Sequence, residues 1–227
     1  MKPWRRQQWC IPSVGAEFVW RMEDILDLYA QDHDPERPQV CFDEMPYQLI
    51  KEKHTPLPAE PGKPQRYDYE YERGGVRNLF MFFEPHAGWR HLEVTRRRTK
   101  EDFAHQIKAL VEEYYPRAKM IRVVLDNLNT HTPAALYETF EPSLAQRILS
   151  KLEFHYTPKH GSWLNMIEAE FAVLANQCIG GRRIGEEETL RSETAAWERE
   201  RNERKATVEW RFTVEDARQK LGRLYPS

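Results

Sequence analysis

Three acidic residues occupy positions from which their side chains could bind divalent metal ions. Asp43 lies in the alternating segment 39–44 (QVCFDE), Asp126 lies near the end of the segment 120–127 (MIRVVLDN), and a glutamate falls within the helical pattern 162–178. Carboxylates at strand ends, joined by one on a flanking helix, can converge on two hard cations such as Mg²⁺ about 4 Å apart. One such ion activates a nucleophile and the other stabilises the leaving oxygen.

Hydrophobic periodicity predicts the elements that must hold these acids. Period-two alternation places Asp43 on the strand face opposite Phe42. Thr99 and Asp102 form a capping-box start for a helix that Pro116 ends. The strands are expected at 39–44, 76–85, 89–95, 120–127 and 152–158, and 208–213 is expected to be a short strand or a turn. The helices are expected at 16–29, 99–116, 133–151 (one or two helices broken near Pro142), 162–178, 186–205 and 214–224.

The identity of the third acid is open on periodicity alone. At 100° per residue the apolar arc of helix 162–178 is centred near Glu170, while Glu168 sits at its edge. Glu170 is therefore expected to be the buried acid, either supporting a metal ligand or serving a structural role. A metal-binding carboxylate should border the packed face and still reach water, and this favours Glu168.

Composition limits the classes of protein that this chain can be. Hydrophobic residues make up 40% and aromatic residues 12% of the 227 residues, which excludes a disordered chain. No apolar run approaches the roughly 20 residues that a bilayer requires. The formal net charge of −2 means that any basic surface must be local.

Cysteine usage favours a reducing compartment. The three cysteines, Cys10, Cys41 and Cys178, are odd in number, widely separated and without CxxC spacing. This pattern indicates neither a disulfide framework nor a thiolate zinc site. The basic N-terminus lacks the apolar core of a signal peptide, so the expected location is the cytoplasm, with association to the nucleoid when DNA is bound.

Three sequence blocks resemble the catalytic blocks of mariner-like bacterial insertion-sequence transposases of the DDE type. The blocks are FDE at 42–44, VVLDNLNTH at 123–131 and FHYTPKHGSWLNMIEAEF at 154–171. Matched residue by residue, the resemblance implies a catalytic and metal-binding triad of Asp43, Asp126 and Glu168.

The resemblance implies an α/β, RNase H-like fold in which three antiparallel strands are followed by parallel strands, flanked by helices. It implies two Mg²⁺ or Mn²⁺ ions, cleavage and strand transfer at DNA phosphodiesters, and a dimer on DNA. Relatives carry N-terminal helix-turn-helix modules that recognise the element's ends. Residues 1–38 are therefore expected to be a linker remnant with a short helix, and 39–227 the catalytic domain.

Basic residues beside these blocks are candidate DNA contacts. Lys159 and His160 precede the helix of Glu168, where a positive loop and a helix N-terminus suit a phosphate. His131 fits either a turn satisfied by backbone or a contact to DNA phosphate. The densest basic cluster, usually just a solvated strand end, is Arg96, Arg97, Arg98 and Lys100.

Other functions fit the same residues. An RNase H-like nuclease without integration activity would keep all three acids. A truncated or inactive transposase remnant could bind only DNA or a full-length transposase. A glycosidase with two carboxylates fits less well, because nothing in the sequence indicates a sugar cleft.

Overall fold

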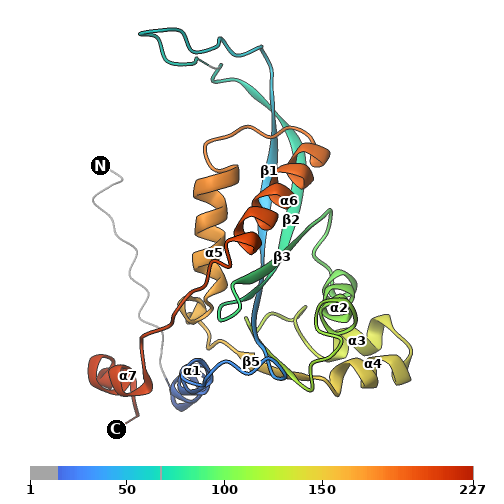
Figure 1. Cartoon of the computed structure of the whole chain (residues 1–227), viewed down its shortest axis with the longest axis vertical. Coiled ribbons are helices and arrows are strands. Elements are labelled where there is room, and N and C mark those ends of the chain that lie inside the picture. The colour runs from blue at the N-terminus through green and yellow to red at the C-terminus, as the bar shows by residue number, and fades with distance from the viewer. Residues whose placement is uncertain (1–14, 67, 227) are drawn as a thin grey trace.

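The computed structural model describes residues 15–66 and 68–226, and its centre is one mixed five-stranded sheet (Figure 1). The strand order is β3-β2-β1-β4-β5. Strands β1, β2 and β3 pair antiparallel, whereas β4 and β5 run parallel to β1. This arrangement confirms the expected fold class. The strands are β1 Gln39–Glu52, β2 Tyr71–Glu84, β3 Trp89–Thr95, β4 Ile121–Leu125 and β5 Leu152–Tyr156.

The two faces of the sheet pack against different helices. The helices are α1 Ala16–Tyr29, α2 Lys100–Ala109, α3 Ala134–Thr139, α4 Pro142–Leu149, α5 Ile167–Leu174, α6 Glu187–Glu203 and α7 Val214–Lys220. Val40 and Phe42 of β1 belong to the core formed with α2, α3 and α4, whereas Cys41 belongs to the core formed with α1, α5, α6 and α7. Because side chains alternate across a strand, Asp43 shares the face of Cys41, opposite Phe42 as expected.

The first strand is much longer than the expected segment 39–44. β1 continues to Glu52 and pairs with β2 in a long hairpin that projects from the body of the molecule (Figure 1). Its pairing with β4 covers only Gln39 to Cys41. Beyond Cys41, the strand pairing described for β1 is with β2. The side of β1 that faces away from β2 therefore tolerates Pro46 and polar residues. Apolar alternation therefore fades while the strand persists.

The helix predicted from Ser162 begins later, at Ile167. Ser162–Leu164 forms a 3-10 turn, and Asn165 adopts an extended conformation between the turn and the helix. The Asn165 side-chain amide donates a hydrogen bond to the Phe42 carbonyl at 2.9 Å. This contact fixes the start of α5 beside β1, and helical periodicity carries no trace of it.

The remaining expectations agree with the structure apart from small shifts of the ends. The capping box of Thr99 and Asp102 starts α2, and α3 and α4 are separate helices on either side of Glu141. Residues 208–213 form no strand. Within residues 15–66 and 68–226 no helix is long and apolar enough to cross a bilayer.

Helix α1 packs one face against the core that contains Cys41. Met22, Ile25 and Leu26 are at most 1% exposed, and they pack in the cluster that also contains Cys41 and Val124 of the sheet. The expected boundary between a linker remnant and the catalytic domain at residue 38 stays a prediction.

Of the three cysteines, Cys10 lies outside the described residues. Cys41 and Cys178 are buried free thiols.

Candidate active site

Strand register brings Asp43 and Asp126 to neighbouring positions just beyond the end of the pairing between β1 and β4. Val40 of β1 is aligned with Val123 of β4 in a parallel pair. Asp43 and Asp126 each lie three residues beyond that pair, so both follow the buried part of their strands in the same direction. The two carboxylates interact electrostatically. The structure therefore assembles two of the three predicted acids.

Asp43 is a carboxyl group in surroundings that disfavour its charge. Burial, with smaller contributions from the negative charges of Asp126 and Glu44, raises the pKa of Asp43 to about 7. The Glu44 backbone N–H donates to Asp43 Oδ1 at 2.8 Å, and His131 also opposes the rise. A divalent cation would relieve the repulsion, because carboxylate oxygens are its preferred ligands.

His131 lies between two carboxylates. Its Nδ1 is hydrogen-bonded to Asp126 Oδ1, and its Nε2 lies 2.9 Å from Glu44 Oε2. Burial opposes a charge on the ring, but the contacts with Asp126 and Glu44 prevail and raise the pKa of His131 to about 9. The side chain is 1% exposed, so a ring contact to DNA requires it to move.

Glu168 and Glu170 differ sharply in their surroundings. Glu170 is 1% exposed and forms ion pairs with Arg90 and Arg201 at 2.8 Å each, as expected for the buried acid. Glu168 is exposed in the first turn of α5. In the described part of the chain, no three His, Cys, Asp or Glu residues gather closely enough to hold a metal ion. The structure thus leaves Glu168 outside the pair formed by Asp43 and Asp126.

The loop before α5 exposes both of its predicted DNA contacts. Lys159 and His160 are exposed beyond the end of β5. The His160 backbone has φ of +65°, a left-handed conformation that is uncommon for a residue with a Cβ. The turn closes with the Gly161 N–H bonded to the Pro158 carbonyl at 2.8 Å.

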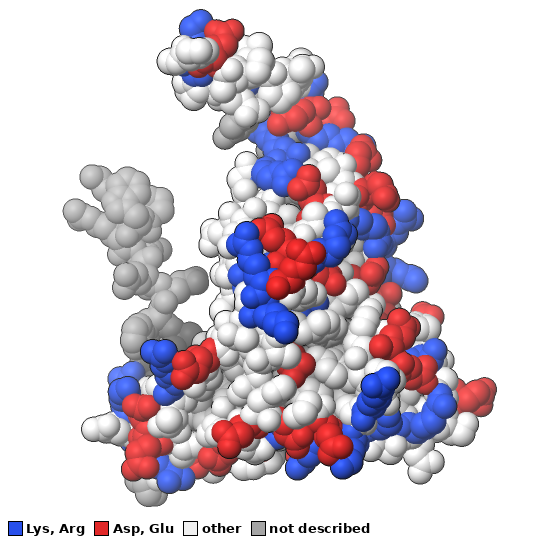
Figure 2. All heavy atoms as spheres, in the orientation of Figure 1, with Lys and Arg blue, Asp and Glu red and all other residues white. Residues whose placement is uncertain are grey.

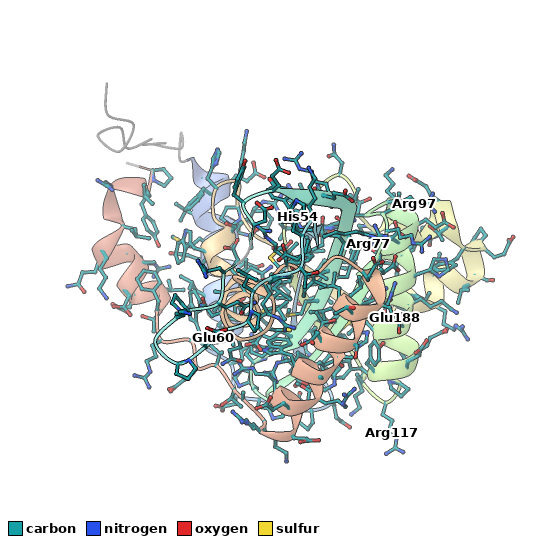
Figure 3. All side chains as sticks on the ribbon, turned by 90° about the horizontal axis from the view of Figure 1, so that it is seen from above. His54, Glu60, Arg77, Arg97, Arg117 and Glu188 are labelled. Carbon is teal, nitrogen blue, oxygen red and sulfur yellow. The ribbon has the colours of Figure 1, made fainter. Side chains whose placement is uncertain are left out.

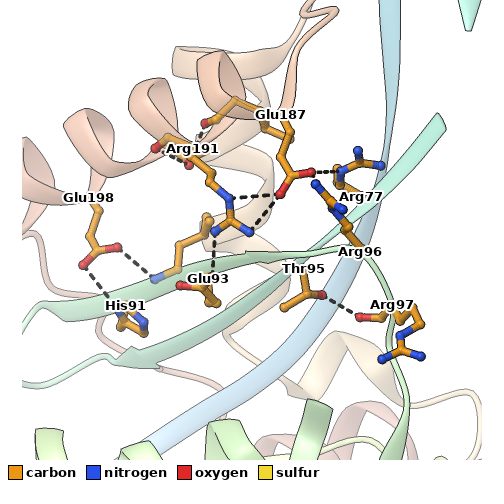
Figure 4. A network of polar contacts seen from close by, with 12 residues as sticks. Arg77, His91, Glu93, Thr95, Arg96, Arg97, Glu187, Arg191 and Glu198 are labelled. Atoms are coloured by element: carbon orange, nitrogen blue, oxygen red, sulfur yellow. Dashed lines mark hydrogen bonds and ion pairs between the residues drawn. The ribbon is translucent and has the colours of Figure 1, made fainter. Parts of the chain in front are cut away.

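The basic cluster is partly neutralised within the molecule. Arg96 pairs with Glu187 at 2.9 Å, Lys100 with Glu138 at 2.7 Å, and Arg98 lies 3.7 Å from Glu44. Figure 4 shows Glu187 also meeting Arg77 and Arg191. Arg97 lies at the edge of the molecule in the view of Figure 3.

Opposite charges are interspersed over the molecular face in Figure 2, in keeping with a net charge of −2. The predicted DNA contact at the basic cluster stays a prediction.

Sequence reasoning did not single out Glu44. The residue stands in the quoted block 42–44, and alternation places it on the same strand face as Phe42. A charged side chain on a core-facing position is the sequence feature that could have identified it, because such groups are buried only with a partner. Its side chain is 3% exposed, and its charged neighbours are His131 at 2.9 Å and Arg98 at 3.7 Å.

The mixed sheet and the paired carboxylates at its edge define the RNase H-like class of catalytic folds. The chain belongs to the DDE superfamily endonuclease family, whose pattern matches residues 38–191. That match contains Asp43, Asp126 and Glu168 and shows membership of an enzyme family. No curated protein matches the chain.

Solved transposase structures share the fold at low sequence identity. The Mos1 mariner paired-end complex with Mn matches with a TM-score of 0.59 and 14% identity, over 96% of this chain and 64% of that chain. The Mos1 paired-end complex with the left transposon end gives 0.59 and 16%, over 88% and 61%. The isolated Mos1 catalytic domain gives 0.54 and 13%, over 87% and 96%. The chain thus spans under two thirds of those two complexed proteins and nearly all of the catalytic domain.

The raised pKa of Asp43 predicts that Asp43→Asn stabilises the metal-free protein at alkaline pH. An upward shift means that the folded state binds the proton more tightly, so wild-type stability falls as pH rises from about 4 through 7. The variant escapes this loss and gains on the order of 4 kcal/mol at pH 8. Urea unfolding in chelator at pH 5 and pH 8 measures the gain. An equal gain at both pH values would contradict the assignment.

Proposed function

We propose that the chain is the catalytic domain of a DDE transposase, which cleaves DNA strands and joins them to target DNA with two divalent metal ions. The proximity of Asp43 in β1 to Asp126 just after β4 carries the proposal, because two carboxylates that repel each other form a favourable binding site for a cation that contacts both. Membership of the DDE endonuclease family supports it.

In this proposal Asp43 and Asp126 hold the metal ions, with Glu168 from α5 completing the second position. Bound ions would supply activation of the attacking hydroxyl or water and stabilisation of the leaving oxygen. Asn165 holds the start of α5 next to β1 through the Phe42 carbonyl. Glu168 lies in the first turn of this helix, three residues after Asn165, so a side-chain rotation or a small helix movement on DNA binding must carry it inward.

DNA is the proposed partner. We propose that the exposed Lys159 and His160 contact the DNA backbone near the carboxylates and that Arg96, Arg97, Arg98 and Lys100 contact it further along. The similar Mos1 structures are described as paired-end complexes, and we therefore propose that two copies of this chain act together on DNA.

The exposed position of Glu168 also favours a second candidate, a remnant that binds DNA without cutting it. In that case Asp43 and Asp126 would hold a metal ion weakly, and DNA affinity would be unchanged in chelator. An RNase H-like nuclease without strand transfer would cut DNA in the presence of Mn²⁺ but would not join the ends.

Calorimetric titration of Mn²⁺ into the wild type and Asp43→Ala tests the proposed site directly. Saturable binding is expected for the wild type and no binding for the variant, because the variant loses an oxygen ligand shared by the site. Glu138→Ala is the control, since Glu138 is an exposed acid paired only with Lys100 in the contacts described above. Equal Mn²⁺ binding by the wild type and Asp43→Ala would overturn the catalytic assignment.

A further inference from the structure

The carboxylate pair is supported from the core side by a second pair of residues. His131 contacts Asp126 through Nδ1 and Glu44 through Nε2, so a chain of Glu44, His131 and Asp126 runs from the buried face of β1 to the edge of the sheet. We propose that His131 is the positioning residue that fixes the Asp126 carboxylate for metal binding, and that Glu44 in turn fixes His131. This inference rests on the proposed function of Asp126.

Burial distinguishes the contacts among Glu44, His131 and Asp126 from an ordinary surface ion pair. The side chains of His131 and Glu44 are 1% and 3% exposed. Burying such groups costs free energy that their pairing offsets only in good geometry, and apolar residues of similar size would pack as well or better. Fold stability alone therefore does not account for a polar pair at this position, whereas a requirement on the placement of Asp126 does.

Aromatic rings pack against the His131 ring, and hydrogen bonds fix its backbone. Its centroid lies 5.0 Å from the Phe103 ring and 5.3 Å from the Phe42 ring. Its backbone N–H donates to the Leu128 carbonyl at 3.0 Å, and its own carbonyl accepts from the Tyr156 hydroxyl at 3.0 Å. These contacts fix the position of the His131 ring relative to Asp126.

Asp126 lacks comparable support from its own strand. β4 ends at Leu125, and the Asp126 side chain is 27% exposed at the start of a loop. The ring engages Oδ1, and this sets the direction of Oδ2, the second oxygen that a metal ion can use. Groups that orient a metal ligand in this way change metal affinity by about 10–100-fold when they are removed.

The decisive variants move the hydrogen-bond donor within a side chain of similar size. In His131→Asn the amide nitrogen can take the place of Nδ1 and still reach Asp126, whereas in His131→Gln it takes the place of Nε2 and faces Glu44. For His131→Asn, which keeps the contact with Asp126 and loses the contact with Glu44, the Mn²⁺ dissociation constant measured by calorimetry is expected to rise about tenfold, as for Glu44→Gln. It is expected to rise about 100-fold for His131→Gln and for His131→Ala, which lose the contact with Asp126.

His155→Ala is the matched control. His155 is also a buried histidine between two carboxylates, with Nδ1 2.8 Å from Asp24 and Nε2 3.5 Å from Glu153, so its ion contacts are with acids other than Asp43 and Asp126. Its loss should lower stability and leave Mn²⁺ affinity unchanged. Urea unfolding of every variant confirms that the protein titrated is folded.

Glu44→Gln tests the contact between Glu44 and His131. It also keeps the proposal testable if the His131 variants do not fold. We expect a weakening of Mn²⁺ binding of about tenfold, and no further weakening when it is combined with His131→Gln, because Glu44 acts through the ring. Wild-type Mn²⁺ affinity in Glu44→Gln or in His131→Gln overturns this inference and leaves the proposed function standing. Absence of Mn²⁺ binding by the wild type itself overturns the proposed function, and the inference with it.

Discussion

Replacing Glu168 with glutamine should abolish metal-dependent DNA cleavage and leave the stability of the fold unchanged. The substitution keeps the size of the side chain and removes a charged metal ligand in the proposed site. A catalytic metal ion contributes several kcal/mol of transition-state stabilisation, so a loss of about 10³-fold or more in cleavage rate is expected. Nicking of supercoiled plasmid DNA with Mn²⁺ measures the effect.

Asp126→Asn in the same assay should show a comparable loss. If Asp126→Asn is inactive and Glu168→Gln retains wild-type activity, the third ligand is another residue. If both variants cut DNA at the wild-type rate, the cleavage arises outside this site. Cleavage by the wild type that persists in chelator would contradict a metal-dependent mechanism.

The opposite pattern is expected for Glu170→Gln, which should destabilise the protein by about 3 kcal/mol. Glu170 and Arg90 are 1% and 0% exposed, and their charges are 2.8 Å apart. Removing one partner of a buried pair leaves the other charge without compensation. Arg90 keeps hydrogen bonds to Gly88, Asn202 and Ala206, and these limit the loss. Urea unfolding at pH 7 gives the free energy of unfolding.

Glu168→Gln is the control for this experiment, because it makes the same chemical change two residues away on the same helix. Glu168 is exposed, so its substitution should change the free energy of unfolding by less than about 0.5 kcal/mol. Equal effects of the two substitutions on stability would contradict the assigned burial. The pair of variants thus separates the structural acid from the proposed metal ligand.

The ion cluster of Glu170 also anchors α5. Arg90 is the second residue of β3 and Arg201 lies near the end of α6, so the buried carboxylate ties α5 to a strand and to another helix. Asn165 ties the start of the same helix to β1. These contacts set where Glu168 can reach, and partial loss of cleavage in folded Glu170→Gln would follow from a shift of α5.

Local patterns in the sequence determined the elements and the candidate acids. Period-two alternation placed Asp43 opposite Phe42, the Thr99 capping box marked the start of α2, and the helical arc identified Glu170 as the buried acid. Each of these depends on residues within a single helix or a single strand, so residue type and spacing are sufficient.

Only the tertiary structure decided how distant residues meet. The pairing of Asp43 with Asp126 depends on the register between β1 and β4, and the contact of Glu44 with His131 joins residues 87 positions apart. The length of β1 depends on its pairing with β2, and the start of α5 on the bond from Asn165 to Phe42. Such contacts leave no periodic trace in the sequence, because they are set by the free energy of packing whole elements together.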